Sequence, residues 1–215
     1  MRLFRRVPDQ PSDTLAYLIV KLDGLRAFRR ADPERLKPWC DRADTTLYDE
    51  VRGDLTAIAF APFENPRLRP WIQTAATFRS LLPIAVFSIV LLTLLQTGLF
   101  TVRNSAIPIV FVVASMVVLL GLVVSDLGAR MGISAFEREN PELNRDERDR
   151  IRGVIDRLFV KYARALKREN RDPAELLLYH ADYKNGENGG TVRKRVLGVF
   201  PARYEMYRVK PARTA

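Results

Sequence analysis

Two long runs without a charged residue constrain the fold of this chain more than any other feature of its sequence. Between Arg79 and Arg103 lie 23 uncharged residues, and between Arg103 and Asp126 lie 22 more. A helix rises about 1.5 Å per residue, so about 20 residues cross a hydrocarbon core of about 30 Å. We therefore predict two transmembrane helices, over residues 81–100 and 106–124.

A soluble protein could also bury two apolar helices in its core, and the sequence leaves this alternative open. Adjacent uncharged runs of this length are nevertheless typical of membrane spans. Pro83 and Pro108 stand near the start of their runs. Proline costs little there, because the first helical turn has unpaired N–H groups in any case.

The short connection between the two runs predicts that they form a hairpin. Residues 101–105 are too few to join anything but antiparallel neighbours. Basic residues flank the hairpin on its outer sides (Arg67, Arg69, Arg79, Arg130, Arg138 and Arg145), whereas the connection holds only Arg103. The positive-inside rule then predicts an integral membrane protein with both termini on the cytoplasmic side, or on the matrix side in an organelle.

The predicted fold class is therefore a mainly α membrane protein, in which a two-span helical hairpin separates two cytosolic segments. We divide the chain into an N-terminal helical segment (1–69), the hairpin region (70–128) and a basic C-terminal segment (129–215). The mean hydropathy of −0.10 averages a strongly apolar hairpin with two polar segments.

The spans themselves hold no Asp, Glu, Lys, Arg or His. Ionisable groups at membrane depth usually mark ion paths or proton relays, so their absence argues against a proton-coupled carrier. Polar residues are present at Ser88, Thr93, Gln96, Thr97 and Ser115. Small residues recur every four positions at Gly121, Ser125 and Ala129, which predicts a face for close helix packing.

The N-terminal segment shows helical spacing of apolar residues. Ser12 or Asp13 is the predicted cap of a first helix, Asp32 begins a second, and a third covers residues 46–60. Three prolines then predict a stiff linker into the membrane: Pro62, Pro66 and Pro70. The apolar positions of the first and third helices are Leu15, Leu18, Ile19, Leu22, Leu25, Leu47, Val51, Leu55 and Ile58.

The C-terminal segment carries most of the excess positive charge, with 20 Lys and Arg against 13 Asp and Glu. Asn144 and Glu147 have the spacing of a capping box, which predicts a helix from there to about Glu169. Five basic residues gather beside its apolar face: Arg150, Arg157, Lys161, Arg164 and Arg168. Such a stripe predicts contact with an anionic lipid surface or an acidic partner, and a plain solvated face is the alternative.

The end of the chain is less regular. We predict a short helix after Asp172, a loop over residues 185–190, and a small β-hairpin pairing 192–200 with 204–209. Arg193, Lys194 and Arg195 form the densest basic cluster and are a second predicted contact for anionic lipid or an acidic partner. Nucleic acid is not an expected partner, because the chain is predicted to be membrane-anchored.

Few residues in the sequence suggest chemistry. A single Cys and a single His exclude an intrachain disulfide framework and a zinc site of those ligands. His180 and Asp182 could form an acid–base pair, but no nucleophile motif accompanies them. Cys40 beside Trp39 is typical of a packed small hydrophobe. We predict no enzyme activity, no catalytic residue and no metal or cofactor.

The leading hypothesis is a non-enzymatic accessory, scaffold or assembly subunit of a membrane complex. Its expected partners are membrane lipids and other membrane subunits, or further copies of itself. The alternative is a homo-oligomeric pore or channel-type effector, with Ser88, Thr93, Gln96 and Ser115 as pore-lining groups. The third is a membrane-tethered enzyme that uses His180 and Asp182.

Overall fold

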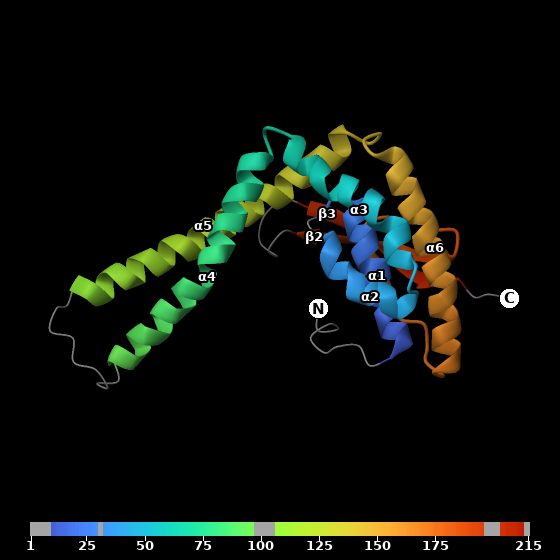
Figure 1. Ribbon diagram of the computed structural model, residues 1–215, viewed down its shortest axis with the longest axis horizontal. Helices are drawn as coiled ribbons and strands as arrows, with labels where there is room; N and C mark the ends of the chain where they lie inside the picture. The colour runs from blue at the N-terminus through green and yellow to red at the C-terminus, as the bar shows by residue number, and fades with distance from the viewer. Residues whose placement is uncertain (1–9, 30–31, 97–105, 196–202, 213–215) are drawn as a thin grey trace. The chain divides into compact units, whose positions relative to one another are not determined.

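The computed structural model describes residues 10–29, 32–96, 106–195 and 203–212. The chain forms two compact units, one of Met1–Pro62 with Ser134–Ala215 and one of Phe63–Ile133. The first unit therefore combines residues from both ends of the chain. Figure 1 shows the helices and strands of each unit.

The N-terminal part of the first unit is helical, as predicted. It holds α1 (Pro11–Arg26), the short 3-10 helix η1 (Pro33–Leu36), α2 (Lys37–Ala43) and α3 (Leu47–Glu64). The apolar positions predicted from helical spacing in α1 and α3 are all buried. Asp32 begins η1 and accepts a hydrogen bond from the Glu34 N–H at 3.1 Å.

Two predictions about this region are wrong in detail. The N-cap of α1 is Gln10, so Ser12 and Asp13 lie inside the first turn rather than at the cap. The proline linker is also shorter than predicted, because α3 continues through Pro62 and α4 already includes Pro70. Proline is well tolerated at the start of a helix, where its missing N–H would have no partner.

The C-terminal part of the first unit contributes the long helix α6 (Arg145–Arg168), which packs along α1. Ile151, Ile155, Leu158 and Phe159 are fully or almost fully buried. The helix ends where predicted. The predicted capping box is wrong, because Asn144 is left-handed (φ 53°) and its side chain makes no capping hydrogen bond.

A three-stranded antiparallel sheet completes the first unit, with strand order β1-β3-β2. The strands are β1 (Leu176–Leu178), β2 (Gly186–Arg195) and β3 (Arg203–Pro211). The predicted pairing of the last two strands is confirmed in the described residues, with Val192 opposite Met206. Residues 196–202 of the predicted hairpin lie outside the described part of the chain.

Two further predictions are corrected by the sheet. The stretch after Asp172 forms β1 rather than a helix, and Leu176 and Leu178 are buried on either side of a half-buried Leu177. This alternation is that of a strand, which pairs with β3. Residues 186–190 belong to β2 rather than to a loop, and Gly190 (φ 124°) lies in the irregular register between Asn188 and Thr191.

The second unit contains two long helices, α4 (Arg69–Gln96) and most of α5 (Ala106–Glu139). Their contacts run in opposite directions along the two helices. Ser115 lies against Ala85, Gly121 against Phe78, and Gly128 against Trp71. The helices are therefore antiparallel, and the outer end of the first predicted span, residues 97–100, lies outside the described residues.

Candidate functional site

Most of the apolar side chains that the structure describes in α4 and α5 are exposed. Phe87 is 67% exposed, Val110 65% and Ile84 62%. The segments Arg69–Leu91 and Val110–Glu139 are both long and apolar enough to cross a membrane, and few of their residues are buried. Soluble proteins rarely expose a continuous apolar surface of this length. Such a surface is typical of sites that contact lipid or other proteins.

The contact between α4 and α5 is made through small residues of α5. A Cβ atom at Gly121 would come within 2.3 Å of the Phe78 ring, and one at Gly128 within 2.4 Å of the Trp71 ring. Ser125 and Ala129 are buried. Gly121, Ser125 and Ala129 are the residues predicted to pack closely, whereas Gly128 was not singled out. Its spacing of seven from Gly121, two helical turns, was the available signal.

The two described polar residues of the predicted spans, Ser88 and Ser115, form hydrogen bonds within the hairpin. Ser88 Oγ donates to the Ile84 carbonyl at 2.9 Å, and Ser115 Oγ lies 3.5 Å from the Ala85 carbonyl. Both serines are buried. Arg79 pairs with Asp126, which Arg130 also contacts at 2.6 Å. The side chains of Thr93, Gln96 and Thr97 lie outside the described part of the structure.

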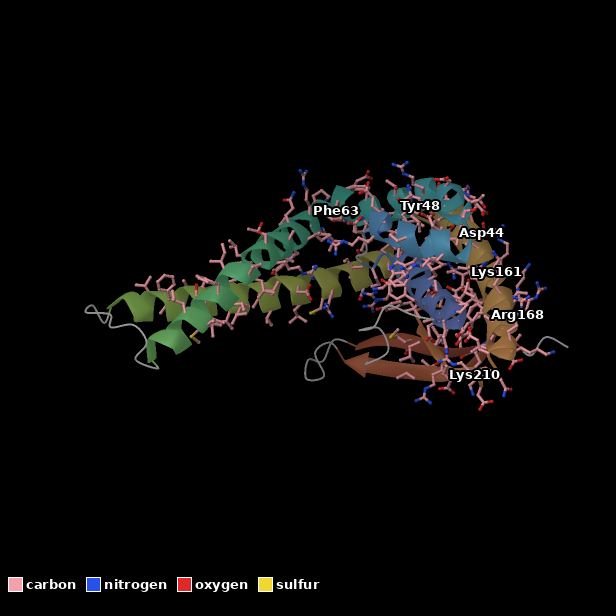
Figure 2. All side chains as sticks on the ribbon, turned by 60° about the horizontal axis from the view of Figure 1, so that its bottom comes forward. Asp44, Tyr48, Phe63, Lys161, Arg168 and Lys210 are labelled. Atoms are coloured by element: carbon pink, nitrogen blue, oxygen red, sulfur yellow. The ribbon has the colours of Figure 1, made fainter. Side chains whose placement is uncertain are left out.

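Three members of the basic stripe on α6 have acidic partners within the chain itself. Arg150 Nη2 lies 2.7 Å from Asp54 Oδ1, and Arg157 pairs with Glu50. Lys161 Nζ lies 2.8 Å from Asp44 Oδ2, and Figure 2 labels both residues. The Lys161 ammonium and the Thr46 N–H and hydroxyl lower the pKa of Asp44 to about 2.

The remaining predicted contact residues differ from these three. Arg164 and Arg168 are exposed and have no acidic partner among the described residues. They line a pocket between α1 and α6 of about 370 Å³. Arg193, Lys194 and Arg195 lie on β2 opposite Glu205, Tyr204 and Arg203 of β3. Their side chains lie outside the described structure, so their predicted lipid or partner contact stays a prediction.

A buried ionic cluster, which we call the Asp23 cluster, joins the two ends of the chain. Asp23 on α1 is 1% exposed. Its carboxylate accepts hydrogen bonds from the Tyr179 N–H at 2.5 Å, the Tyr183 hydroxyl at 2.6 Å and the His180 N–H at 3.3 Å. His180 Nδ1 lies 2.9 Å from the same carboxylate. A buried charge requires such partners, so Asp23 fixes the connection between β1 and β2 to α1.

His180 and Asp182, which the tethered-enzyme hypothesis would pair for acid–base chemistry, have other partners. His180 pairs with Asp23. The Asp182 carboxylate instead accepts hydrogen bonds from both terminal nitrogens of the buried Arg26, with Nη1 and Oδ1 2.5 Å apart. Although they lie only two residues apart in the connection between β1 and β2, the two side chains have different partners. Burial raises the pKa of Asp182, but the Arg26 hydrogen bond and charge outweigh it and lower that pKa to about 2.

His180 also connects this cluster to the C-terminal turns of α5. Its Nε2 lies 3.5 Å from Glu137 Oε1. Burial works against the charged imidazolium, but the Asp23 and Glu137 carboxylates outweigh it, so the pKa of His180 is raised. Arg29 donates to Ser134 Oγ at 2.9 Å, and Arg148 stacks over the Phe28 ring. Charged residues of α1, α5, α6 and the β1–β2 connection thus form one network of ionic contacts.

The chemistry available in the described residues is that of paired charges. Burial, with Asp41 nearby, raises the pKa of the Cys40 thiol to about 11, so it is a poor nucleophile. No group of His, Cys, Asp and Glu in the described ranges could hold a metal ion. Sequence reasoning missed Asp23 and Arg26, although charged residues inside the apolar face of α1 were a visible signal.

No protein-family model, no curated protein and no solved structure matches this chain.

Proposed function

We propose that this chain is an integral membrane protein whose α4–α5 hairpin spans the bilayer. The exposed apolar surface of the two helices carries this proposal. Moving such a surface from water into hydrocarbon is favourable by about 25 cal/mol of free energy per Å² of apolar area. The glycine contacts with Phe78 and Trp71 are also of the kind that holds helices together in lipid, where small residues permit close approach.

The first unit is built from segments on both sides of the α4–α5 hairpin in the sequence, and this supports a specific membrane topology. Met1–Pro62 and Ser134–Ala215 fold together around one core, so both must stand on the same side of the membrane. The intervening chain must then cross the bilayer an even number of times. The two candidate spans α4 and α5 satisfy this requirement if both cross. The excess of Arg on the outer sides of the hairpin favours the cytoplasmic or matrix side for that unit.

We further propose a non-enzymatic role as an accessory, scaffold or assembly subunit. The described residues offer a polar unit held by ion pairs and an apolar hairpin whose outer faces remain free for other spans. The pore hypothesis receives less support, because Ser88 and Ser115 lie inside the hairpin rather than on its outer face. The tethered-enzyme hypothesis loses its acid–base pair, since His180 and Asp182 have other partners.

Membrane extraction tests the insertion, and affinity purification tests the role. If α4 and α5 span the bilayer, the chain stays in the pellet after alkaline carbonate washing and is released only by detergent. Purification in mild detergent should then retain a defined partner subunit or a defined oligomer, without ion flux in liposomes. Release by carbonate would contradict insertion. A stable monomer without any co-purifying protein would contradict the subunit role.

A further inference from the structure

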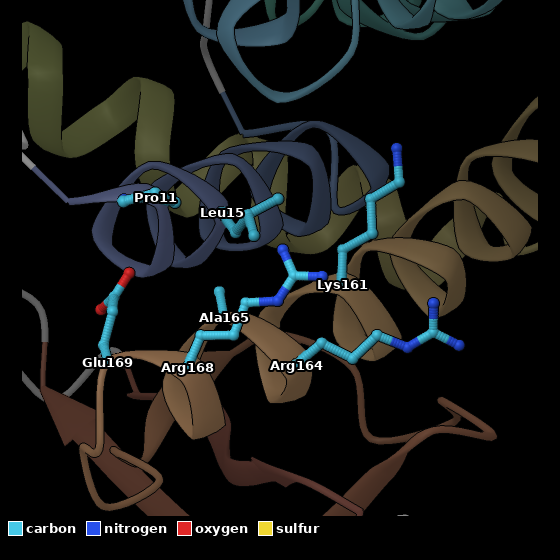
Figure 3. Close-up of a pocket in the computed structure, with 7 residues that line it drawn as sticks. All are labelled: Pro11, Leu15, Lys161, Arg164, Ala165, Arg168 and Glu169. Carbon is cyan, nitrogen blue, oxygen red and sulfur yellow. The ribbon is translucent and has the colours of Figure 1, made fainter.

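The pocket between α1 and α6 combines unpaired positive charge with apolar walls. It is lined by Pro11 and Leu15 of α1 and by Ala165 of α6, together with charged residues of α6. Its volume of about 370 Å³ lies within the range of small-molecule sites. Figure 3 shows the Arg168 side chain extending toward Leu15 and Lys161, and the Glu169 carboxylate turned toward Pro11.

The charges around this pocket are unevenly matched. The Lys161 ammonium is held by Asp44 at 2.8 Å. Glu169 accepts a hydrogen bond from the Ser12 N–H at 3.1 Å and pairs with Arg171 at 3.4 Å, so its charge is also matched. Arg164 and Arg168 remain, without an acidic partner among the described residues. Figure 3 shows the Arg168 guanidinium beside Leu15 and the Arg164 side chain extending away from it, so Arg168 is the nearer of the two guanidinium groups available for a ligand.

We infer that this pocket binds the phosphate headgroup of an anionic phospholipid. Guanidinium groups match the oxygens of a phosphate with paired hydrogen bonds. The apolar side chains of Leu15 and Ala165 would contact the glycerol carbons and the first methylene groups. An acidic peptide fits less well, because the pocket is small. The inference rests on the membrane attachment proposed above, where phospholipids are abundant.

Short-chain lipids test this site without requiring insertion. The detergent-solubilised full chain is titrated with dihexanoyl phosphatidic acid, dihexanoyl phosphatidylcholine and inorganic phosphate. We expect phosphatidic acid to bind tightest. Replacing both arginines, in R164Q/R168Q, should weaken its binding by about tenfold or more, because two charge-assisted contacts are lost. The double variant K167Q/K184Q removes the same charge from exposed residues outside the pocket and should bind as the unaltered chain does.

A second variant tests the shape of the pocket without changing its charge. Leucine in place of Ala165 fills part of the cavity, so A165L should weaken binding of phosphatidic acid and leave binding of inorganic phosphate unchanged. Thermal melting of each variant establishes that it is folded. A folded A165L that binds as the unaltered chain does would overturn the inference even if R164Q/R168Q fails to fold.

Three further results would overturn the lipid site. Equal losses in R164Q/R168Q and K167Q/K184Q would show that only net charge matters. Equal affinity for phosphatidylcholine would show that the anionic headgroup is not recognised. Inorganic phosphate binding as tightly as phosphatidic acid would assign the site to free phosphate. Carbonate extraction measures insertion separately, so failure of this site and failure of the proposed function are distinguishable.

Discussion

Asp23 and His180 are separated by 157 positions in the chain, yet Asp23 Oδ1 lies 2.9 Å from His180 Nδ1. The contact joins α1 to the segment between β1 and β2. It therefore helps to hold both ends of the chain in one unit, with the candidate spans between them. The membrane topology proposed for this chain depends on the association of its N- and C-terminal segments in the first unit. The contacts that hold these segments together are therefore the first to test.

Replacing Asp23 with Ala should destabilise the first unit by about 3 kcal/mol or more. The change leaves the Tyr183 hydroxyl and the Tyr179 N–H buried without their acceptor. Chemical denaturation in detergent, followed by circular dichroism, measures the loss. Asp172→Ala is the matched control, because Asp172 is exposed, and it should change stability by about 0.5 kcal/mol or less. Equal effects of the two variants would contradict the account.

His180 should make the stability of this unit depend on pH. Its folded-state pKa is raised above 6.5, so the charged form stabilises the fold. This contribution is fully present below pH 6.5 and is lost as pH rises through the raised folded-state pKa. Unfolding free energies measured from about pH 6 to about pH 9 should fall more steeply for the unaltered chain than for His180→Gln. Parallel curves for the two proteins would show that the imidazole carries no such contribution.

Arg26 and Asp182 should show a measurable coupling energy. The Arg26 side chain is 7% exposed and the Asp182 side chain 43%, so the pair is only partly screened by water. A double-mutant cycle of Arg26→Met and Asp182→Asn should give a coupling of about 1–2 kcal/mol. The low pKa of Asp182, about 2, means that this contribution is present above pH 3.8 and is lost as pH falls toward 2. Strictly additive single effects would contradict the pairing.

Gly128→Ala should weaken the α4–α5 contact by about 1–3 kcal/mol, because the added methyl group meets the Trp71 ring. Gly53→Ala on α3 is the matched control. A Cβ at Gly53 has nothing described within 4 Å, so this substitution should stabilise its helix by about 0.5–1 kcal/mol. Thermal melting in detergent distinguishes the two. Replacing Trp71 with Ala in the Gly128→Ala background should relieve the clash and restore part of the lost stability. A further loss of stability in the double variant would contradict the proposed clash.

Local patterns in the sequence predicted much of the helical structure. Helical spacing identified the buried apolar residues Leu15, Leu18, Ile19, Leu22 and Leu25 of α1 and Leu47, Val51, Leu55 and Ile58 of α3, and the uncharged runs identified the two candidate spans. These signals are local, because each depends on residues within a few turns of one helix. The strand β1 was missed for the same reason. Three leucines in a row have no visible period, and the partner strand β3 lies about thirty residues further along the chain.

The candidate site was harder to predict because its contacts are distant in sequence. The stripe on α6 predicted contact with anionic lipid or an acidic partner, whereas Arg150 and Arg157 pair within the chain with Asp54 and Glu50, about a hundred residues away on α3. The third hypothesis relates His180 to Asp182 because the two are close in sequence. In the structure they have different partners, and no local pattern relates His180 to Asp23.

The central claim is that α4 and α5 both cross the bilayer and that the unit formed by the chain ends stays on one side. Single cysteines at positions 103 and 184, introduced as Arg103→Cys and Lys184→Cys, report the two sides to a membrane-impermeant maleimide. Cys40 is fully buried, so the unaltered chain is the unlabelled control. The account predicts that, in intact cells, only the cysteine at position 103 is labelled, whereas the one at position 184 requires permeabilisation. Labelling of both positions from the same side of a sealed membrane would contradict it.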